Sequence, residues 1–141
     1  MGEVKLKVML DPGAKIPTRA HEDDGGLDLY SRVNAVLRPG MIAEFDTGVH
    51  VAVPRGYVGL LTSKSGLMKK GITSRGTIDA GYTGSIKAIL YHQGTEPVKI
   101  AKGQKITQLV ICPIITPEPE IVDSLEETDR GNGGFGSTGE F

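Results

Sequence analysis

The segment Gly76-Thr77-Ile78-Asp79-Ala80-Gly81-Tyr82-Thr83-Gly84 lies between two apolar runs that are typical of β-strands. Glycines at its ends and centre permit the positive φ angles of a tight turn, so the segment predicts a β-hairpin. It contains one carboxylate, Asp79, and one aromatic ring, Tyr82, in a part of the chain with few acidic residues. Backbone N–H and C=O groups at such a tip can contact a flat polar ligand. We therefore expect a ligand-binding hairpin that other parts of the chain complete.

The sequence around this segment predicts an all-β fold with no long helix. Short apolar or alternating runs recur about every ten residues, separated by turns that contain Gly or Pro. The 20 glycines and 8 prolines among 141 residues favour a turn-rich barrel or sandwich. One short helix is expected to end at Gly71, and Ile121-Val122 could add a brief strand. The expected strands are 4–8, 27–31, 47–53, 57–62, 85–91, 98–100 and 106–111.

The character of the chain changes near residue 115, so we expect a folded domain over 1–115 and a C-terminal arm over 116–141. The sequence of 116–120 is Thr-Pro-Glu-Pro-Glu, which predicts stiff, extended chain. If residues 116–130 are extended they span on the order of 50 Å, enough to reach a neighbouring subunit. The Gly-rich end is either a disordered terminus or a phosphate-wrapping loop. In the second case Arg130 would clamp a phosphate and Phe135 would cover a base.

Charge is distributed unevenly along a chain whose net charge is -1. Residues 54–105 hold nine basic and two acidic residues, whereas residues 106–141 hold one basic and seven acidic residues. The basic centre either binds a small anion such as a polyphosphate or is a scattered, solvated surface. The basic residues are not interleaved with exposed aromatic residues, so nucleic acid is not the expected partner.

Several classes of protein find no support in the sequence. The single cysteine, Cys112, excludes an intrachain disulfide framework, and we expect a buried, reduced thiol in a cytoplasmic protein. No leader sequence opens the chain and no apolar run approaches a membrane span, so no membrane partner is expected. The histidines His21, His50 and His92 lack metal-ligand spacing and are interpreted as non-ligands. No order of Ser, His and Asp indicates acyl transfer.

Some candidate site residues admit two interpretations. Ser65 is either a helix N-cap or, with Gly66 and Lys64, part of an anion-binding turn. Asp79 is either a general base for water or the side chain of an Asx turn. Asp28 alternates with apolar neighbours on a predicted strand, so it is either solvated or close to a bound cation.

Five segments of the chain, from about Gly25 to Gly139, resemble in order the five motifs of the homotrimeric dUTP pyrophosphatases (dUTPases). The third is the opening segment, close to G-x-I-D-x-x-Y-x-G, and the fifth, residues 130–139, is nearly the full R-G-x-G-G-F-G-S-T-G. The family usually has Arg where this chain has Lys64 and Lys105, and many relatives have Asn at His92. The first, second and fourth segments are Gly25-Gly26-Leu27-Asp28-Leu29-Tyr30-Ser31, Ser63-Lys64-Ser65-Gly66-Leu67 and Lys102-Gly103-Gln104-Lys105-Ile106-Thr107-Gln108-Leu109.

This resemblance implies a jelly-roll-like distorted β-barrel of the β-clip type, with at most one short helix, that binds nucleotide through residues 1–115. It also implies a homotrimer with three shared sites. Each site would take the third motif from one subunit and the first, second and fourth from another. The fifth motif would arrive on the swapped C-terminal arm of the remaining subunit.

The resemblance also implies the chemistry, which is Mg²⁺-dependent hydrolysis of dUTP to dUMP and pyrophosphate. Asp79 would activate the water that attacks the α-phosphorus, and Asp28 would contact Mg²⁺ through water only, with no direct protein ligand. The reaction prevents uracil incorporation into DNA and supplies dUMP for dTMP synthesis. The expected substrate-binding residues are Lys64, Ser65, Gly66, Gly76, Thr77, Ile78, Tyr82, Lys87, Gln108, Arg130, Phe135, Gly136, Ser137 and Thr138.

Three alternatives remain at this point. A dCTP deaminase would share the fold, but that group relies on a glutamate in the hairpin region and lacks the complete fifth motif. A regulatory protein on the same scaffold would bind dUTP without turnover. A non-enzymatic β module for sugars or peptides would need an aromatic platform, whereas aromatic residues make up only 5% of this chain.

Overall fold

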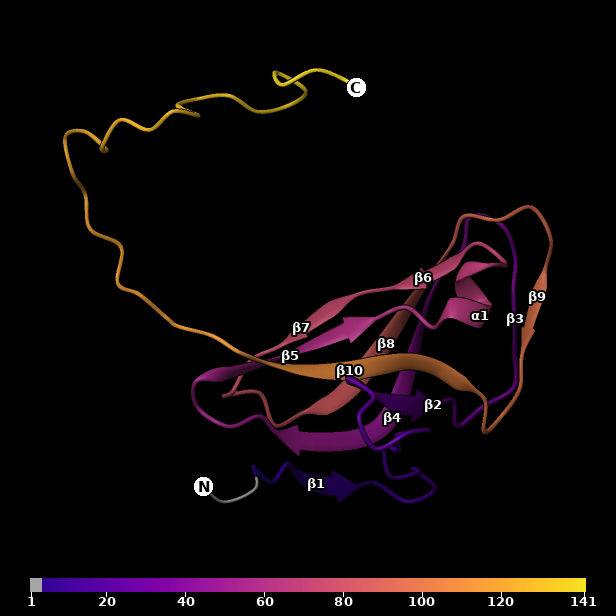
Figure 1. Cartoon of the computed structure of the whole chain (residues 1–141). Helices are drawn as coiled ribbons and strands as arrows, with labels where there is room; N and C mark the ends of the chain where they lie inside the picture. Colours follow the sequence, from indigo (N-terminus) through magenta and orange to yellow (C-terminus); the bar gives the residue numbers. More distant parts are fainter. Residues whose placement is uncertain (1–3) are drawn as a thin grey trace.

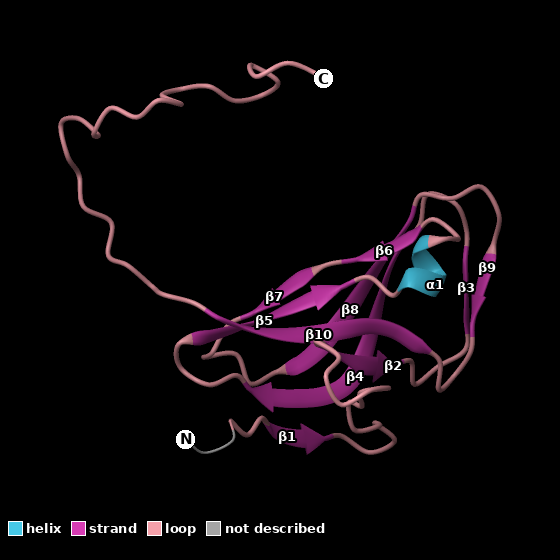
Figure 2. Cartoon of the chain, viewed as in Figure 1, coloured by secondary structure: helices cyan, strands magenta, loops and turns pink. Residues whose placement is uncertain are grey.

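A computed structural model describes residues 4–141 and shows a β-rich body with a long C-terminal extension (Figure 1). Strand β8 (Ser85–His92) follows the alternation expected of a half-buried strand: Ile86, Ala88 and Leu90 are buried, and the residues between them are not. Figure 2 shows that strands dominate and that α1 (Ser65–Met68) is a single short turn of helix. The expected all-β class with at most one short helix is confirmed.

All strand pairs are antiparallel, and they form two four-stranded sheets and one two-stranded sheet. The first sheet has the order β1 (Lys7–Leu10), β4 (Ile42–Ala52), β8, β6 (Ile72–Ser74). The second has the order β2 (Gly26–Tyr30), β10 (Lys105–Pro113), β5 (Tyr57–Thr62), β7 (Gly76–Ile78). The third pairs β3 (Ala35–Leu37) with β9 (Val98–Ile100). Among residues 4–141 the strands do not close into one barrel.

The predicted hairpin around Asp79 is wrong in its pairing. Strand β7 pairs with β5 and strand β8 pairs with β4 and β6, so residues 79–84 cross from one sheet to the other. None of the three glycines in the segment has a positive φ. Gly76 and Gly84 are instead tightly packed. A Cβ added at Gly76 would lie 3.2 Å from the Leu61 side chain, and one added at Gly84 would lie 2.6 Å from the Tyr82 hydroxyl. Gly76 and Gly84 therefore provide space for neighbouring side chains, whereas a Cβ at Gly81 would meet nothing within 4 Å.

Other differences from the expected elements are local. β1 begins at Lys7 rather than residue 4, and β4 begins at Ile42 rather than residue 47. β3 and β6 have three residues each and were not predicted, although β9, which is equally short, was. Ile121 and Val122 are exposed and belong to no strand, so that prediction is wrong. Cys112 is a free thiol as expected, but it is half-buried rather than buried.

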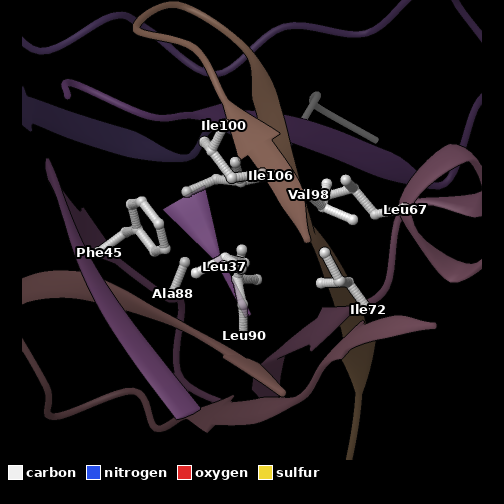
Figure 3. Packing of buried hydrophobic residues seen from close by; sticks show 9 residues of the cluster. All are labelled: Leu37, Phe45, Leu67, Ile72, Ala88, Leu90, Val98, Ile100 and Ile106. Atoms are coloured by element: carbon white, nitrogen blue, oxygen red, sulfur yellow. The ribbon is translucent and has the colours of Figure 1, made fainter. Parts of the chain in front are cut away.

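Two clusters of buried side chains position the functional segments. One, drawn in Figure 3, comprises Leu37, Phe45, Leu67, Ile72, Ala88, Leu90, Val98, Ile100 and Ile106. Leu67 lies on α1, so its burial in this cluster holds the helix against the sheets. The second comprises Leu29, Val49, Val51, Val53, Leu61, Ile78, Ile86 and Leu109. It includes Ile78, so it anchors the chain immediately before Asp79.

The chain leaves the body after β10. The Ile114 N–H donates to the Gly56 carbonyl at 2.9 Å, and from there residues 115–141 run away from the sheets as loop (Figures 1 and 2). Large apolar side chains on this segment are exposed, including Ile115, Leu125 and Phe135. Within the described part of the chain, no helix has the length and apolar character needed to cross a membrane.

Candidate active site

Asp28 is the centre of a charged cluster within the body. It lies on β2 opposite Gln108 on β10, and its side chain is 4% exposed. Its Oδ1 is 2.6 Å from Lys64 Nζ and its Oδ2 is 3.2 Å from Lys105 Nζ. The solvated interpretation of Asp28 is therefore wrong, because both carboxylate oxygens are paired with lysines inside the fold.

The lysines keep this carboxylate ionised. Burial by itself would raise the pKa of Asp28, but the hydrogen bonds and charges of Lys64 and Lys105 outweigh it and hold the pKa below its ordinary value of 3.8. Lys64 and Lys105 stand where the resemblance leads one to expect arginines. Both departures from the family pattern thus contact the same carboxylate.

Gln108 is fixed beside the cluster. Its amide Nε2 donates to the Ser63 carbonyl at 3.1 Å, which directs the side chain toward the end of β5. A Cβ at Gly26 would lie 2.1 Å from Gln108 Oε1, so only glycine leaves room for this side chain. The sequence prediction did not include Gly26 among the site residues. A glycine within a strand was the available signal, because it marks a close approach of another group.

Ser65 and Gly66 open the single turn of α1 and are exposed. The N-cap is Lys64, which makes no side-chain capping bond, so the interpretation of Ser65 as an N-cap is wrong. The Ser65 hydroxyl is instead presented to solvent at the same end of β5 as Lys64. This leaves the anion-binding interpretation of the turn.

Asp79 and Tyr82 lie on the crossover between the two large sheets. The Tyr82 N–H donates to the main-chain carbonyl of Asp79 at 3.0 Å, so the turn is closed by the backbone and the Asp79 side chain is exposed. This geometry does not match the Asx-turn interpretation. The Tyr82 hydroxyl donates to the Ser85 carbonyl at 2.8 Å, which places the ring over Gly84. Tyr82 remains 41% exposed.

The Asp28 cluster and the Asp79 crossover lie at opposite ends of β5. In the β5–β7 register Gly59 is opposite Ile78, so Asp79 lies beside the start of β5, whereas Lys64 and Ser65 follow its end. Six residues of strand separate the two positions by about 20 Å. One chain therefore brings together Asp28, Ser65 and Gln108, but it does not bring Asp79 to them.

Lys87 is engaged by another carboxylate. It lies on β8 opposite Asp46 on β4, with Nζ 3.2 Å from Asp46 Oδ2. Hydrogen bonds from the Ser85 hydroxyl and the Gly48 N–H, together with Lys87, lower the pKa of Asp46 to about 2. A substrate contact by Lys87 would compete with this ion pair. Of the other predicted contacts, Thr77 is exposed and Ile78 is buried, so Ile78 can offer only its backbone.

The arm residues are not brought to the other predicted site residues (Figure 1). Arg130 Nε donates to the Gly133 carbonyl at 2.7 Å, and the Gly133 N–H donates back to the Arg130 carbonyl at 3.0 Å. Further turns join Ser137 to Gly134 and Gly139 to Gly136. Phe135, Gly136, Ser137 and Thr138 are exposed.

The histidines and carboxylates of the described chain form no metal-binding cluster. Within residues 4–141, no three His, Cys, Asp or Glu side chains lie together as a metal site. His92, the third departure from the family pattern, is buried, and its Nε2 is 2.6 Å from the Glu96 carbonyl. Its Nδ1 accepts a hydrogen bond from the Gly94 N–H at 3.0 Å. His92 therefore holds the turn between β8 and β9.

Comparison with known proteins identifies the family. The dUTPase family model matches residues 13–139. The deoxyuridine 5'-triphosphate nucleotidohydrolase of Clostridium tetani is 42% identical and covers 99% of each chain, and that of Mycolicibacterium gilvum is 43% identical over 94% of this chain and 92% of its own.

Solved structures agree. A dUTPase variant of Staphylococcus bacteriophage 80alpha with dUpNHpp has a TM-score of 0.90 and 35% identity, over 96% of this chain and 99% of its own. A variant dUTPase of phage phi11 of S. aureus, described with a structural Mg(II) ion, has a TM-score of 0.81 and 33% identity, over 88% of this chain and 100% of its own. By sequence and by fold, the chain belongs to the dUTPase family.

Proposed function

We propose that the protein is a dUTP diphosphatase that hydrolyses dUTP to dUMP and pyrophosphate. The observation that carries this proposal is the family match over residues 13–139, which includes every predicted site residue. The dUpNHpp in the related phage structure supports a deoxyuridine triphosphate as the ligand class. In the cell such an enzyme would keep uracil out of DNA and supply dUMP for dTMP synthesis, and we expect it in the cytoplasm.

We propose that the active site is shared among the subunits of a homotrimer. The separation of about 20 Å between Asp79 and Lys64 along β5 supports this, since one nucleotide must contact both regions. The exposed apolar arm supports it too, because an arm that does not contact its own body has its side chains free for another subunit. In this arrangement residues 1–115 form the nucleotide-binding domain and residues 116–141 close the site.

In the proposed reaction the exposed Asp79 carboxylate takes a proton from water as the water oxygen bonds to the α-phosphorus. The bond from the α-phosphorus to its bridging oxygen breaks, and pyrophosphate leaves. Ser65 and Gln108 hold phosphate oxygens, and Arg130 contacts the terminal phosphate through its planar guanidinium. Positioning and charge neutralisation provide most of the rate enhancement in such transfers.

The nucleoside would be recognised on the 79–84 crossover and by the arm. The Tyr82 ring, fixed by its bond to the Ser85 carbonyl, would lie under the deoxyribose and exclude a ribose 2′-hydroxyl. Backbone groups from Gly76 to Gly84 would bind the edge of uracil, and Phe135 would cover its face. The Ser137 and Thr138 hydroxyls would contact the phosphate chain.

Mg²⁺ fits this site as a cation held mainly by substrate. Asp28 is the carboxylate nearest the proposed phosphate site, and its two oxygens already pair with Lys64 and Lys105. That pairing suits a contact through water and not direct ligation. Mg²⁺ commonly binds substrate phosphates and retains several waters, and here it would neutralise phosphate charge.

The test is pyrophosphate release from dUTP, dTTP, dCTP and UTP with Mg²⁺, by wild-type protein and by Asp79→Asn. We expect hydrolysis of dUTP alone. The kcat of the variant should fall by about 10²- to 10⁴-fold, because a positioned general base contributes that much. Its affinity for dUpNHpp should change little, since the amide keeps the shape of the side chain. Asp23→Asn, in an exposed turn, is the matched control.

Other outcomes point to the alternatives. Unchanged turnover by Asp79→Asn would show that the base lies elsewhere. Ammonia release from dCTP would identify a deaminase. Tight binding of dUTP by the wild-type protein without hydrolysis would favour a regulatory binding protein.

A further inference from the structure

His50 connects the Asp79 crossover to the N-terminal part of the chain. It lies on β4 with a side chain that is 19% exposed. Its Nδ1 is 2.8 Å from the Thr83 carbonyl oxygen, and its Nε2 is 3.0 Å from Asp11 Oδ1. No pattern in the sequence singles out His50, which was interpreted only as a residue that binds no metal.

The two partners of His50 are both acceptors. A carbonyl oxygen and a carboxylate oxygen donate no hydrogen, whereas a neutral imidazole has only one N–H. Both contacts are therefore hydrogen bonds only when His50 is the doubly protonated imidazolium. In the neutral ring one nitrogen lone pair would face an oxygen lone pair.

The surroundings favour that charged form. The Asp11 N–H donates to the Gly48 carbonyl at 2.8 Å, which fixes the loop that bears the carboxylate. The Thr83 carbonyl and Asp11, with a smaller contribution from Asp46, raise the pKa of His50 above its ordinary value of 6.5. Partial burial of the ring lowers the pKa of His50, but the hydrogen bonds and the carboxylates outweigh it. Lys7 lines the same cavity as His50 and Thr83.

Thr83 lies next to Tyr82 and four residues after Asp79, on the crossover assigned above to nucleoside recognition. Within residues 4–141, the other hydrogen bonds that hold this crossover come from Tyr82 itself, through its N–H and its hydroxyl. Resting on the proposed function, we propose that the His50 imidazolium is a positioning residue that fixes the Thr83 carbonyl and thereby holds the crossover for nucleotide binding. His50 does not touch the substrate.

The consequence is a dependence of affinity on pH. As the pH rises through the pKa of His50, the ring keeps one N–H and loses one of its two bonds. The crossover then samples more conformations, and the affinity for nucleotide falls. The lost bond holds the crossover and not the ligand itself, so only part of its free energy is lost from binding. The expected loss is about 2- to 10-fold in affinity, with a smaller change in kcat.

Two substitutions separate the two contacts of His50. The amide nitrogen of Asn can occupy the place of Nδ1, and that of Gln can occupy the place of Nε2. His50→Asn therefore retains a donor to Thr83, whereas His50→Gln retains a donor to Asp11. His21→Asn, at an exposed histidine in a turn, is the matched control.

The experiment measures the dissociation constant of dUpNHpp between about pH 6 and pH 9 for wild type and the three variants. Wild type and the control should weaken about 2- to 10-fold over this range. His50→Asn should bind like wild type at low pH and lose the pH dependence. His50→Gln should be weak at every pH. Ring ¹⁵N shifts should show both His50 nitrogens still protonated above pH 6.5, the ordinary pKa of a histidine.

The proposal is overturned if His50→Gln binds as well as His50→Asn, or if the ring ¹⁵N shifts show His50 already neutral at pH 6.5, the ordinary pKa of a histidine. It is also overturned if the wild-type affinity is constant over the range. Binding of dUpNHpp without hydrolysis of dUTP would defeat the proposed enzymatic function alone. The affinities of the variants and the ring shifts would then still test whether His50 positions the crossover.

Discussion

The Asp28 cluster and the C-terminal arm both carry side chains assigned to phosphate binding, yet they are held in opposite ways. In the cluster a buried carboxylate pairs with Lys64 at 2.6 Å and with Lys105 at 3.2 Å. In the arm, Arg130 bonds only to nearby Gly133, and Phe135 is fully exposed. The cluster is fixed by the packed body before any ligand binds, whereas the arm needs another surface to fix it.

The two regions therefore differ in the conformational entropy that they lose when a ligand binds. Ordering a backbone residue costs about 1–2 kcal/mol, and glycines cost the most, so closure of the Gly-rich arm is expensive. The turns between Gly134 and Ser137 and between Gly136 and Gly139 reduce that cost, since part of the conformation already exists. The arm is thus suited to close over a ligand and open again.

The largest expected effect comes from removing the arm's end. Truncation after Glu127 should lower dUTP hydrolysis by on the order of 100-fold or more, because the positioning of the phosphate chain is lost. The free energy of unfolding should change by no more than about 0.5 kcal/mol, since residues 128–141 bury no part of the two core clusters. Pyrophosphate release kinetics and urea unfolding measure these two quantities, and light scattering checks that the oligomeric state is unchanged.

Truncation after Gly139 is the control for this experiment. It removes two exposed residues and leaves the Gly-rich segment intact, so activity should be retained. Full activity after truncation at Glu127 would show that the arm does not close the site.

A substitution in the Asp28 cluster should lower the free energy of unfolding of the body. Asp28→Asn leaves two ammonium groups without their carboxylate, and we expect a loss of about 1–3 kcal/mol, reduced from the cost of a fully buried pair because both lysines contact solvent. The pKa of Asp28 is lowered in the fold, so its contribution is present above pH 3.8 and is lost as the pH falls through the lower folded value. Urea unfolding at several pH values should show that acid lowers the stability of wild type more than that of Asp28→Asn, which keeps only the contribution of other carboxylates such as Asp46.

Asp23→Asn provides the comparison, since Asp23 is exposed in a turn. Equal stability of Asp28→Asn and wild type at neutral pH would mean that the ion pairs contribute nothing net to the fold.

The smallest effect is expected at a single arm residue. Phe135→Ala should weaken dUpNHpp binding by about 10-fold, the loss expected for one ring stacked on a base, and should leave the stability unchanged. Phe141→Ala removes an equally exposed ring outside the Gly-rich segment and should have no effect on affinity. Equal affinities of the two variants would contradict the role of Phe135 over the base.

Local sequence patterns predicted much of the body. The period of two in the strand 85–91 and the Gly/Pro turns identified the all-β class, because these signals depend only on neighbouring residues. The motif around Asp79 was placed correctly in the chain, but its strands pair with different partners than expected. Pairing depends on which strands the packed core brings together, and no local pattern contains that information.

The sequence by itself therefore determined the fold class, the five motifs and, through them, the family. Only the tertiary structure decided that Asp28 is buried between two lysines, that Gly26 and Gly84 provide space, and that His50 bridges Asp11 and Thr83. These features join residues that are far apart in the chain. Their geometry follows from strand register and sheet packing, which are properties of the whole fold.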